Sequence, residues 1–155
     1  MTYTLDQIDY KIIDQLTSDA RQPVAEIARR VGLSKTPVAA RIKYLEEIGL
    51  ITGYRAVLNP MKMGLSHVAY VEVRVTDTRQ AALEKFNAAV KLVPEIEECY
   101  MIAGGFDYLL KVRSRDIAEY RKIMGEKISA LPYVNATATY VAMEAVIEQG
   151  AFAIS

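Results

Sequence analysis

Few residues in this chain have the types and spacing that enzyme chemistry needs. The sequence contains one histidine, His67, and one cysteine, Cys99. A zinc site built only from side chains uses four such ligands, and a single thiol forms no disulfide within the chain. Neither a nucleophile beside a base nor a pair of spaced carboxylates stands out. We therefore expect no catalytic residue, no metal and no cofactor, with His67 structural and Cys99 inert in an apolar strand.

The segment AGGFDYLL, residues 103–110, carries candidate binding chemistry. Its adjacent glycines bring backbone amides close to a ligand carboxylate, and Asp107 either holds an ammonium group or stabilises a turn through backbone bonds. The segment joins two expected strands, so it is not a phosphate-binding loop, which joins a strand to a helix. The residues by themselves predict a tight two-glycine hairpin. A small-molecule cleft at this loop is the alternative, and it is implied by a resemblance to a known family. The candidate ligand-binding residues are Met101, Ala103, Gly104, Gly105 and Asp107, with Thr137 and Thr139 from a neighbouring chain.

A second candidate surface lies on the helix expected after VGLS, residues 31–34. At 100° per residue, Ile42 and Leu45 fall within about 40° of Val38 and form a buried stripe. The opposite side and its shoulders are small, polar and basic, which suits a DNA major groove flanked by phosphates. A solvated face of a three-helix unit is the alternative interpretation. The candidate DNA-binding residues are Arg29, Arg30, Ser34, Lys35, Thr36, Ala39, Ala40, Arg41, Lys43 and Tyr44.

Local signals indicate how these faces are positioned. Thr4 and Gln7 fit a capping box at the start of a first helix. Gly32 follows a second helix at the place where a left-handed residue is common. Ser34 is a natural cap for the third helix, and Pro37 is tolerated in its first turn. The pattern predicts three helices with a sharp turn between the second and the third.

The pattern changes after the third helix. Residues 50–59, LITGYRAVLN, place β-forming residues around Thr-Gly and predict a small wing or hairpin. From residue 66 the order is strand, helix, strand, strand, helix, strand, which is typical of a ferredoxin-like sheet with both helices on one face. Such a sheet leaves its other face open, and an exposed, partly apolar face indicates a homodimer. The residues expected on the open face are Tyr70, Glu72, Arg74, Leu109, Thr137 and Val141.

The expected fold class is therefore α+β: an N-terminal winged helix-turn-helix followed by a ferredoxin-like βαββαβ domain, which the open sheet face predicts to oligomerise. We place the helix-turn-helix domain at residues 1–59, a linker at 60–65 and the second domain at 66–155. The net charge is zero, which disfavours indiscriminate nucleic-acid binding but leaves room for a local basic patch. We expect no signal peptide, since the first residues include an early acid and no apolar stretch, and no apolar run is long enough to span a membrane. We therefore expect a cytoplasmic protein without a membrane partner.

Two stretches resemble one known family. Residues 5–60, from LDQIDYKIIDQL through VGLSKTPVAARIKYLEEIGLI to LNP, and residues 98–112, ECYMIAGGFDYLLKV, are similar to the Lrp/AsnC, or feast/famine, transcriptional regulators. Gly104, Asp107 and Tyr108 hold positions of the family's effector-domain motif. The chain departs from the family at Ala39 and Ala40, where basic residues are common, which affects operator sequence and affinity rather than class.

The resemblance implies a sequence-specific regulator of transcription that binds double-stranded DNA and responds to an amino acid or a related metabolite. It also implies that hairpin loops line clefts where dimers meet, and we expect homodimers that assemble into an octamer. Two alternatives remain: a nucleoid-type architectural DNA-binding protein, and a small dimeric ferredoxin-like enzyme. The sequence leaves open the effector, the operator and whether the regulator activates or represses.

Overall fold

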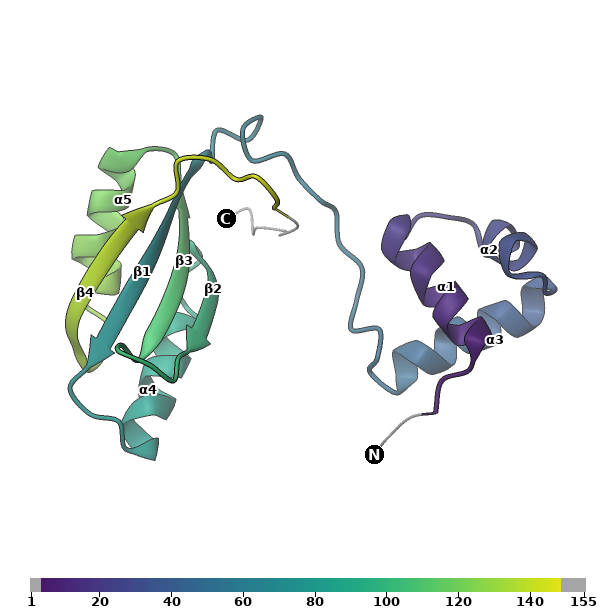
Figure 1. Ribbon diagram of the computed structural model, residues 1–155, viewed down its shortest axis with the longest axis horizontal. Helices are drawn as coiled ribbons and strands as arrows, with labels where there is room; N and C mark the ends of the chain where they lie inside the picture. The colour runs from purple at the N-terminus through teal and green to yellow at the C-terminus, as the bar shows by residue number, and fades with distance from the viewer. Residues whose placement is uncertain (1–3, 149–155) are drawn as a thin grey trace. The chain divides into compact units, whose positions relative to one another are not determined.

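The computed structural model describes residues 4–148, and the chain divides between Arg55 and Ala56 into two compact units. The first unit contains three helices: α1 (Gln7–Ser18), α2 (Val24–Val31) and α3 (Lys35–Glu47). The second contains a four-stranded sheet with two helices (Figure 1). This arrangement confirms a helix-turn-helix followed by a ferredoxin-like domain.

A small apolar core holds the three helices together. Ile12 of α1, Ile27 of α2, and Val38 and Leu45 of α3 are fully buried, and the last two belong to the stripe that the helical spacing predicts for α3. Gly32 ends α2 in the left-handed conformation, with φ of 76°, as expected. The turn between α2 and α3 therefore follows from local chemistry and a shared core.

The caps of the first and third helices differ from the expectation. The capping box of α1 is formed by Asp6 and Asp9, not by Thr4 and Gln7: Asp6 accepts bonds from the amides of Ile8 and Asp9, and Asp9 accepts from the Asp6 amide. The Asp6 carboxylate also suits the positive end of the helix. Ser34 occupies the N-cap position of α3, but its side chain makes no capping bond.

The predicted wing is not formed, because residues 50–59 contain no strand. The Tyr54 hydroxyl instead donates a hydrogen bond of 2.8 Å to Glu46 near the end of α3. A strand needs a partner for its backbone groups, and this stretch pairs with none in the described part of the chain. The β-forming residues alone were therefore a misleading signal.

The second unit runs in the order β1 (His67–Val75), α4 (Gln80–Val90), β2 (Ile96–Met101), β3 (Tyr108–Ser114), α5 (Ile117–Ile123), a π-helical turn η1 (Met124–Ile128) and β4 (Val134–Val141). The strand order is β2-β3-β1-β4, and every pair is antiparallel. Both helices lie on one face of this sheet (Figure 1). The order is that of the predicted split βαβ unit.

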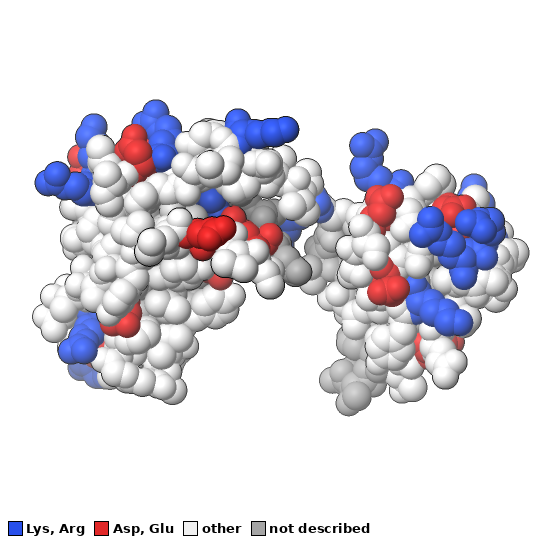
Figure 2. All heavy atoms as spheres, turned by 45° about the horizontal axis from the view of Figure 1, so that its top comes forward, with Lys and Arg blue, Asp and Glu red and all other residues white. Residues whose placement is uncertain are grey.

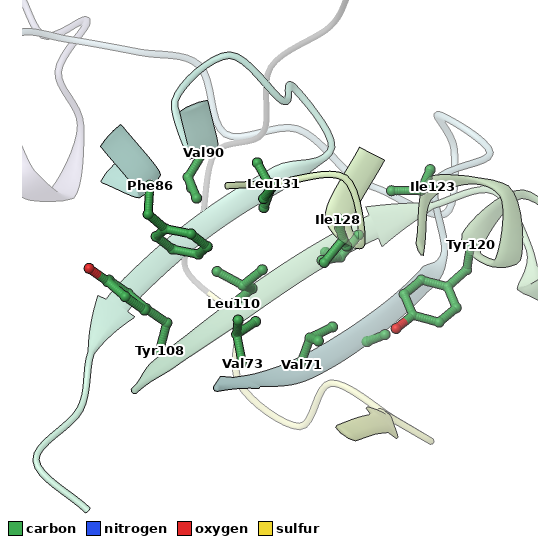
Figure 3. Packing of buried hydrophobic residues seen from close by; sticks show 12 residues of the cluster. Val71, Val73, Phe86, Val90, Tyr108, Leu110, Tyr120, Ile123, Ile128 and Leu131 are labelled. Carbon is green, nitrogen blue, oxygen red and sulfur yellow. The ribbon is translucent and has the colours of Figure 1, made fainter. Parts of the chain in front are cut away.

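The core of this unit lies between the helices and one face of the sheet. Val71 and Val73 of β1 and Leu110 of β3 are fully buried, and Phe86 of α4 packs against them (Figure 3). The alternation predicted for β1 is confirmed, since Tyr70, Glu72 and Arg74 fall on the other face. Leu109 lies on that open face as well, opposite Glu72.

The register of β4 corrects two of the residues expected on the open face. Thr137 is paired with Val73 and Val141 with Ala69, so both lie on the helix-covered face. The open face of β4 carries Ala136, Ala138 and Tyr140 instead. In the sequence VNATATYV neither of the two sets of alternate residues consists of large aliphatic side chains. The sequence therefore does not show which set faces the helices, and a one-residue slip in register exchanges the two faces.

Candidate nucleic-acid interface and effector site

The outward face of α3 is exposed as the helical spacing predicts. Val38 and Leu45 are fully buried, which directs the opposite side of the helix to solvent. The side chains on the N-terminal part of that side are mostly short, and the first turn carries no acidic residue. A helix with so little side-chain bulk fits a groove about 12 Å wide. The exposed candidates on and just before the helix are Ser34, Lys35, Thr36, Ala39, Ala40, Lys43 and Tyr44.

Basic side chains also gather before the turn, at the end of α2. Arg29 and Arg30 each pair with Glu26, at 2.7 and 2.8 Å, and their side chains are 71% and 49% exposed. The hydrogen bond from Arg29, followed by that from Arg30, lowers the pKa of Glu26 to about 2. Figure 2 shows Lys and Arg side chains collected on one side of the helical unit, with acidic groups among them. Exposed ion pairs are weak, so these arginines remain available to phosphates.

Arg41 is placed differently from the other basic candidates. Its guanidinium contacts Asp6 and Asp9 of α1, both at 2.7 Å, and only a third of its side chain is exposed. These carboxylates raise the pKa of Arg41, and the hydrogen bond to Asp9 is the largest cause. Arg41 thus ties α3 to the start of α1. The position of Arg41 at the edge of the outward helix face suggested a phosphate contact. Its two carboxylate partners were not evident from the sequence, because both lie more than thirty residues away.

The glycine segment forms a six-residue loop, residues 102–107, rather than a two-residue turn. The loop is closed by a hydrogen bond of 2.8 Å from the Ile102 amide to the Asp107 carbonyl. Neither Gly104 nor Gly105 has a positive φ. An added Cβ would meet nothing within 4 Å at Gly105 and only Ile102 at 3.5 Å at Gly104. The protomer itself therefore does not require glycine at either position, and both backbones are open to an approaching group.

Asp107 anchors this loop to the sheet. Its amide donates to the Val73 carbonyl at 2.9 Å, and its Oδ2 accepts from the Val75 amide at 2.8 Å. Of the two roles left open for Asp107, orientation of the loop through backbone bonds is the one observed. Met101 and Ala103 are exposed beside it, as candidates for a ligand wall. The anchor gives the loop a defined shape.

Thr137 and Thr139 do not meet the glycine loop within one protomer. They lie on β4, at the opposite edge of the sheet from β2. The Thr139 hydroxyl bonds the Tyr120 hydroxyl at 2.5 Å, and the Thr137 hydroxyl contacts the Met124 sulfur at 3.9 Å. Both are therefore engaged with the helical layer of their own chain.

A buried ionic cluster on the open face was missed by the sequence reasoning. Lys111 and Arg113 of β3 are buried and contact Glu97 at 3.3 and 2.5 Å, and both also pair with Glu148. Burial alone would lower the pKa of Lys111, but the contacts with Glu148 and Glu97 outweigh it and raise that pKa. The sequence signal that could have revealed this cluster is the spacing of Lys111 and Arg113. Two residues apart, they share one face of β3, and the neighbouring strand β2 carries Glu97 and Glu98.

Two classes of site are absent from residues 4–148. No group of three or more His, Cys, Asp or Glu side chains is arranged to hold a metal ion there. No helix in the same residues is long and apolar enough to cross a membrane.

Comparison with protein families gives matches to both units. Residues 5–46 match the AsnC-type helix-turn-helix domain, and residues 68–152 match the Lrp/AsnC ligand binding domain. A proline dehydrogenase transcriptional activator of Rhodobacter capsulatus is 71% identical over 149 residues, which cover 96% of this chain and 97% of that protein. A leucine-responsive regulatory protein of Salmonella typhimurium is 46% identical over 92% of this chain and 87% of its own length.

Solved structures agree with these matches. An AsnC family transcriptional regulator from Agrobacterium tumefaciens is 33% identical, with a TM-score of 0.88 over 93% of this chain and 94% of that one. A transcriptional regulator from Neisseria meningitidis, solved as a complex with L-Met, is 28% identical, with a TM-score of 0.87 over 97% of both chains. The shared fold, the helix-turn-helix and the names of these relatives identify a regulator of transcription and not an enzyme. The chain belongs to the Lrp/AsnC family of transcriptional regulators.

Proposed function

We propose that this protein activates transcription of a proline dehydrogenase gene by binding a specific DNA sequence in response to an amino acid. The observation that carries the proposal is the exposed, small and basic face of α3, in a chain 71% identical along nearly its whole length to a proline dehydrogenase transcriptional activator. The protein acts where its DNA is, in the cytoplasm.

In this proposal α3 enters the major groove. Thr36, Ala40 and Lys43 face base edges, since they lie opposite the buried stripe, and the exposed Ala39 flanks them. The phosphate contacts come from the turn and its flanks, namely Arg29, Arg30, Ser34, Lys35 and Tyr44. Arg41 is assigned instead to positioning, because binding a phosphate would require it to leave the mostly buried Asp9.

The effector is a free amino acid bound at the glycine loop. Support comes from two exposed glycines that neither backbone geometry nor packing requires, and from a structural relative solved with L-Met. Their amides are suited to a carboxylate. L-Proline is the first candidate, because it is the substrate of proline dehydrogenase, the enzyme after which the relative is named. L-Leucine is the second.

Assembly into dimers uses the open face of the sheet. Tyr70 of β1 and Tyr140 of β4 are directly paired there and 38% and 55% exposed, and Tyr100 of β2 is 58% exposed on the same face. Aromatic side chains on an uncovered sheet face are typical of an interface. Dimers then associate to the octamer, which brings glycine loops and β4 threonines from different chains within reach.

The experiment is a gel-shift titration of the proline dehydrogenase promoter, with and without L-proline. The proposal expects tight binding that unrelated duplex DNA does not compete away, and a change in affinity when L-proline is added. A coupling of about 1–3 kcal/mol would change affinity 5- to 150-fold. Equal competition by unrelated DNA would support an architectural protein instead. Specific binding that no amino acid alters would remove the effector part of the proposal alone.

A further inference from the structure

A pocket separate from the DNA-binding face lies between α4 and the edge strand β2. Its volume is about 370 Å³, which is within the usual range of small-molecule sites. Val90, Ile96 and Met101 form the apolar part of its lining. It is formed within a single protomer and needs no neighbouring chain.

The hydroxyl of Tyr108 borders this pocket without a hydrogen-bond partner. Tyr108 is 1% exposed, and its oxygen is unpaired among residues 4–148. Its ring packs on Phe86, with 4.3 Å between the ring centroids, and the hydroxyl points away from Val73 and Leu110 (Figure 3). A buried polar group is normally paired, so this hydroxyl calls for an explanation.

The charge on the helical side of the pocket is positive. Lys91 lines it, is exposed, and makes no ion pair within the described residues. Glu97 and Glu98 also border the pocket, but their carboxylates contact Lys111 at 3.3 and 3.8 Å. Lys111 lies on the open face of the sheet, whereas Leu110, its neighbour in the chain, lies on the core face. The pocket thus combines an apolar part, one cation, one unpaired hydroxyl and two carboxylates that are paired with Lys111.

We propose that this pocket binds a small apolar carboxylic acid. The carboxylate pairs with the Lys91 ammonium group and accepts a hydrogen bond from the Tyr108 hydroxyl, and the alkyl part packs on Val90 and Ile96. Met101 is paired with Tyr108 in the ladder and shifts to admit the ligand, since its unbranched side chain repacks readily. This second site goes beyond the proposed effector function and does not depend on it.

Cys99 provides a local reporter, because it is the only cysteine of the chain and lines the same pocket. The experiment follows alkylation of the full-length protein by iodoacetamide at pH 8.5, where enough thiolate forms even though burial raises the pKa of Cys99. The probe is 3-methylbutanoate, and 3-methylbutan-1-amine is the matched compound of opposite charge. We expect the acid to slow alkylation at least fivefold and the amine to leave the rate unchanged.

Two variants test the recognition groups. Tyr108→Phe and Lys91→Met should each weaken the protecting effect of the acid about tenfold or more. Tyr108→Phe should also unfold at the same temperature as the parent or higher, because it removes an unpaired buried hydroxyl. Equal protection by acid and amine, no protection at all, or protection unchanged in both variants would overturn the proposal.

A loop variant separates this site from the proposed effector site. Gly105→Ala should leave the protection of Cys99 intact, because Gly105 does not line the pocket. Loss of protection in Gly105→Ala would place the acid at the glycine loop and overturn a separate site, without affecting the proposed regulation of transcription. Conversely, DNA binding that does not respond to an amino acid, together with acid-specific protection of Cys99, would contradict only the effector proposal.

Discussion

Arg41 of α3 and Asp9 of α1 lie 2.7 Å apart, and this contact joins the candidate recognition helix to the helix that begins the unit. The Asp9 side chain is 10% exposed and also closes the capping box of α1. One guanidinium therefore supports both the start of α1 and the orientation of α3.

Replacing Arg41 by Ala should destabilise the helical unit, because it leaves the mostly buried Asp9 carboxylate without its cation. Lys43→Ala is the matched control, since Lys43 is exposed and its ion pair with Glu47 is long, at 3.6 Å. Thermal unfolding followed by circular dichroism should show a clearly lower midpoint for Arg41→Ala only. Equal midpoints would remove the positioning role.

Lys35→Ala and Arg30→Ala should weaken binding to every DNA sequence alike. Each loss of a phosphate contact should reduce the slope of log affinity against log salt concentration by about one unit. Lys85→Ala is the control, because Lys85 is exposed on α4 in the other unit. A change in sequence preference for Lys35→Ala would instead show that this side chain contacts bases.

Gly105→Ala should leave the stability of the protein unchanged, since the added Cβ meets nothing within 4 Å and no positive φ is involved. The same methyl group should obstruct a ligand that approaches the backbone closely. We expect operator affinity without amino acid to stay the same and the response to the amino acid to fall at least tenfold. A full response would place the effector elsewhere.

Asp107→Ala should abolish the amino-acid response by releasing the bond between Asp107 and the Val75 amide. Asp107→Asn keeps an oxygen acceptor for that amide and removes only the negative charge. If Asp107 acts by shaping the loop, the Asn variant should retain most of the response in gel-shift titrations. If it pairs with the ammonium group of the effector, both variants should lose the response.

Tyr140→Asp should convert the protein to monomers. Tyr140 is half exposed in the protomer, so the change costs the isolated fold little, but it would bury an unpaired carboxylate in a dimer. Asn135→Asp, on the same strand and also exposed, is the control. Sedimentation velocity should show the parent and Asn135→Asp as dimers or larger, and Tyr140→Asp as a slower species. Unchanged assembly of Tyr140→Asp would place the interface on another surface.

The contact of Glu148 with Lys111 should make stability depend on pH in the acid range. The hydrogen bond from Lys111 is the largest of the interactions that lower the pKa of Glu148 below its usual 4.5. The stabilisation is therefore present above pH 4.5 and is lost as the pH falls through the lower pKa of the folded state. Urea unfolding at pH 7 and at pH 3 should show a smaller difference for Glu148→Gln than for the parent, and an equal difference would contradict this assignment.

Much of the architecture is determined by the sequence alone. The spacing of Ile12, Val38 and Leu45, the left-handed Gly32 and the alternation along β1 act over a few residues, and helical and pleated geometry convert each of them directly into a buried face. The order of strands and helices then leaves few ways to cover the apolar side of the sheet. The helix-turn-helix and the ferredoxin-like sheet follow from such local rules.

Other features were decided by the tertiary structure. The partners of Arg41, the anchor of Asp107 on β1 and the cluster around Lys111 join residues more than ten positions apart, and charge alone does not select between a nucleic acid and a carboxylate of the same chain. The face on which Thr137 lies depended on a one-residue choice of register that VNATATYV does not specify. Residues 50–59 gained no strand because β propensity has no effect without a pairing partner. In each case the deciding energy comes from a contact formed only once distant segments meet.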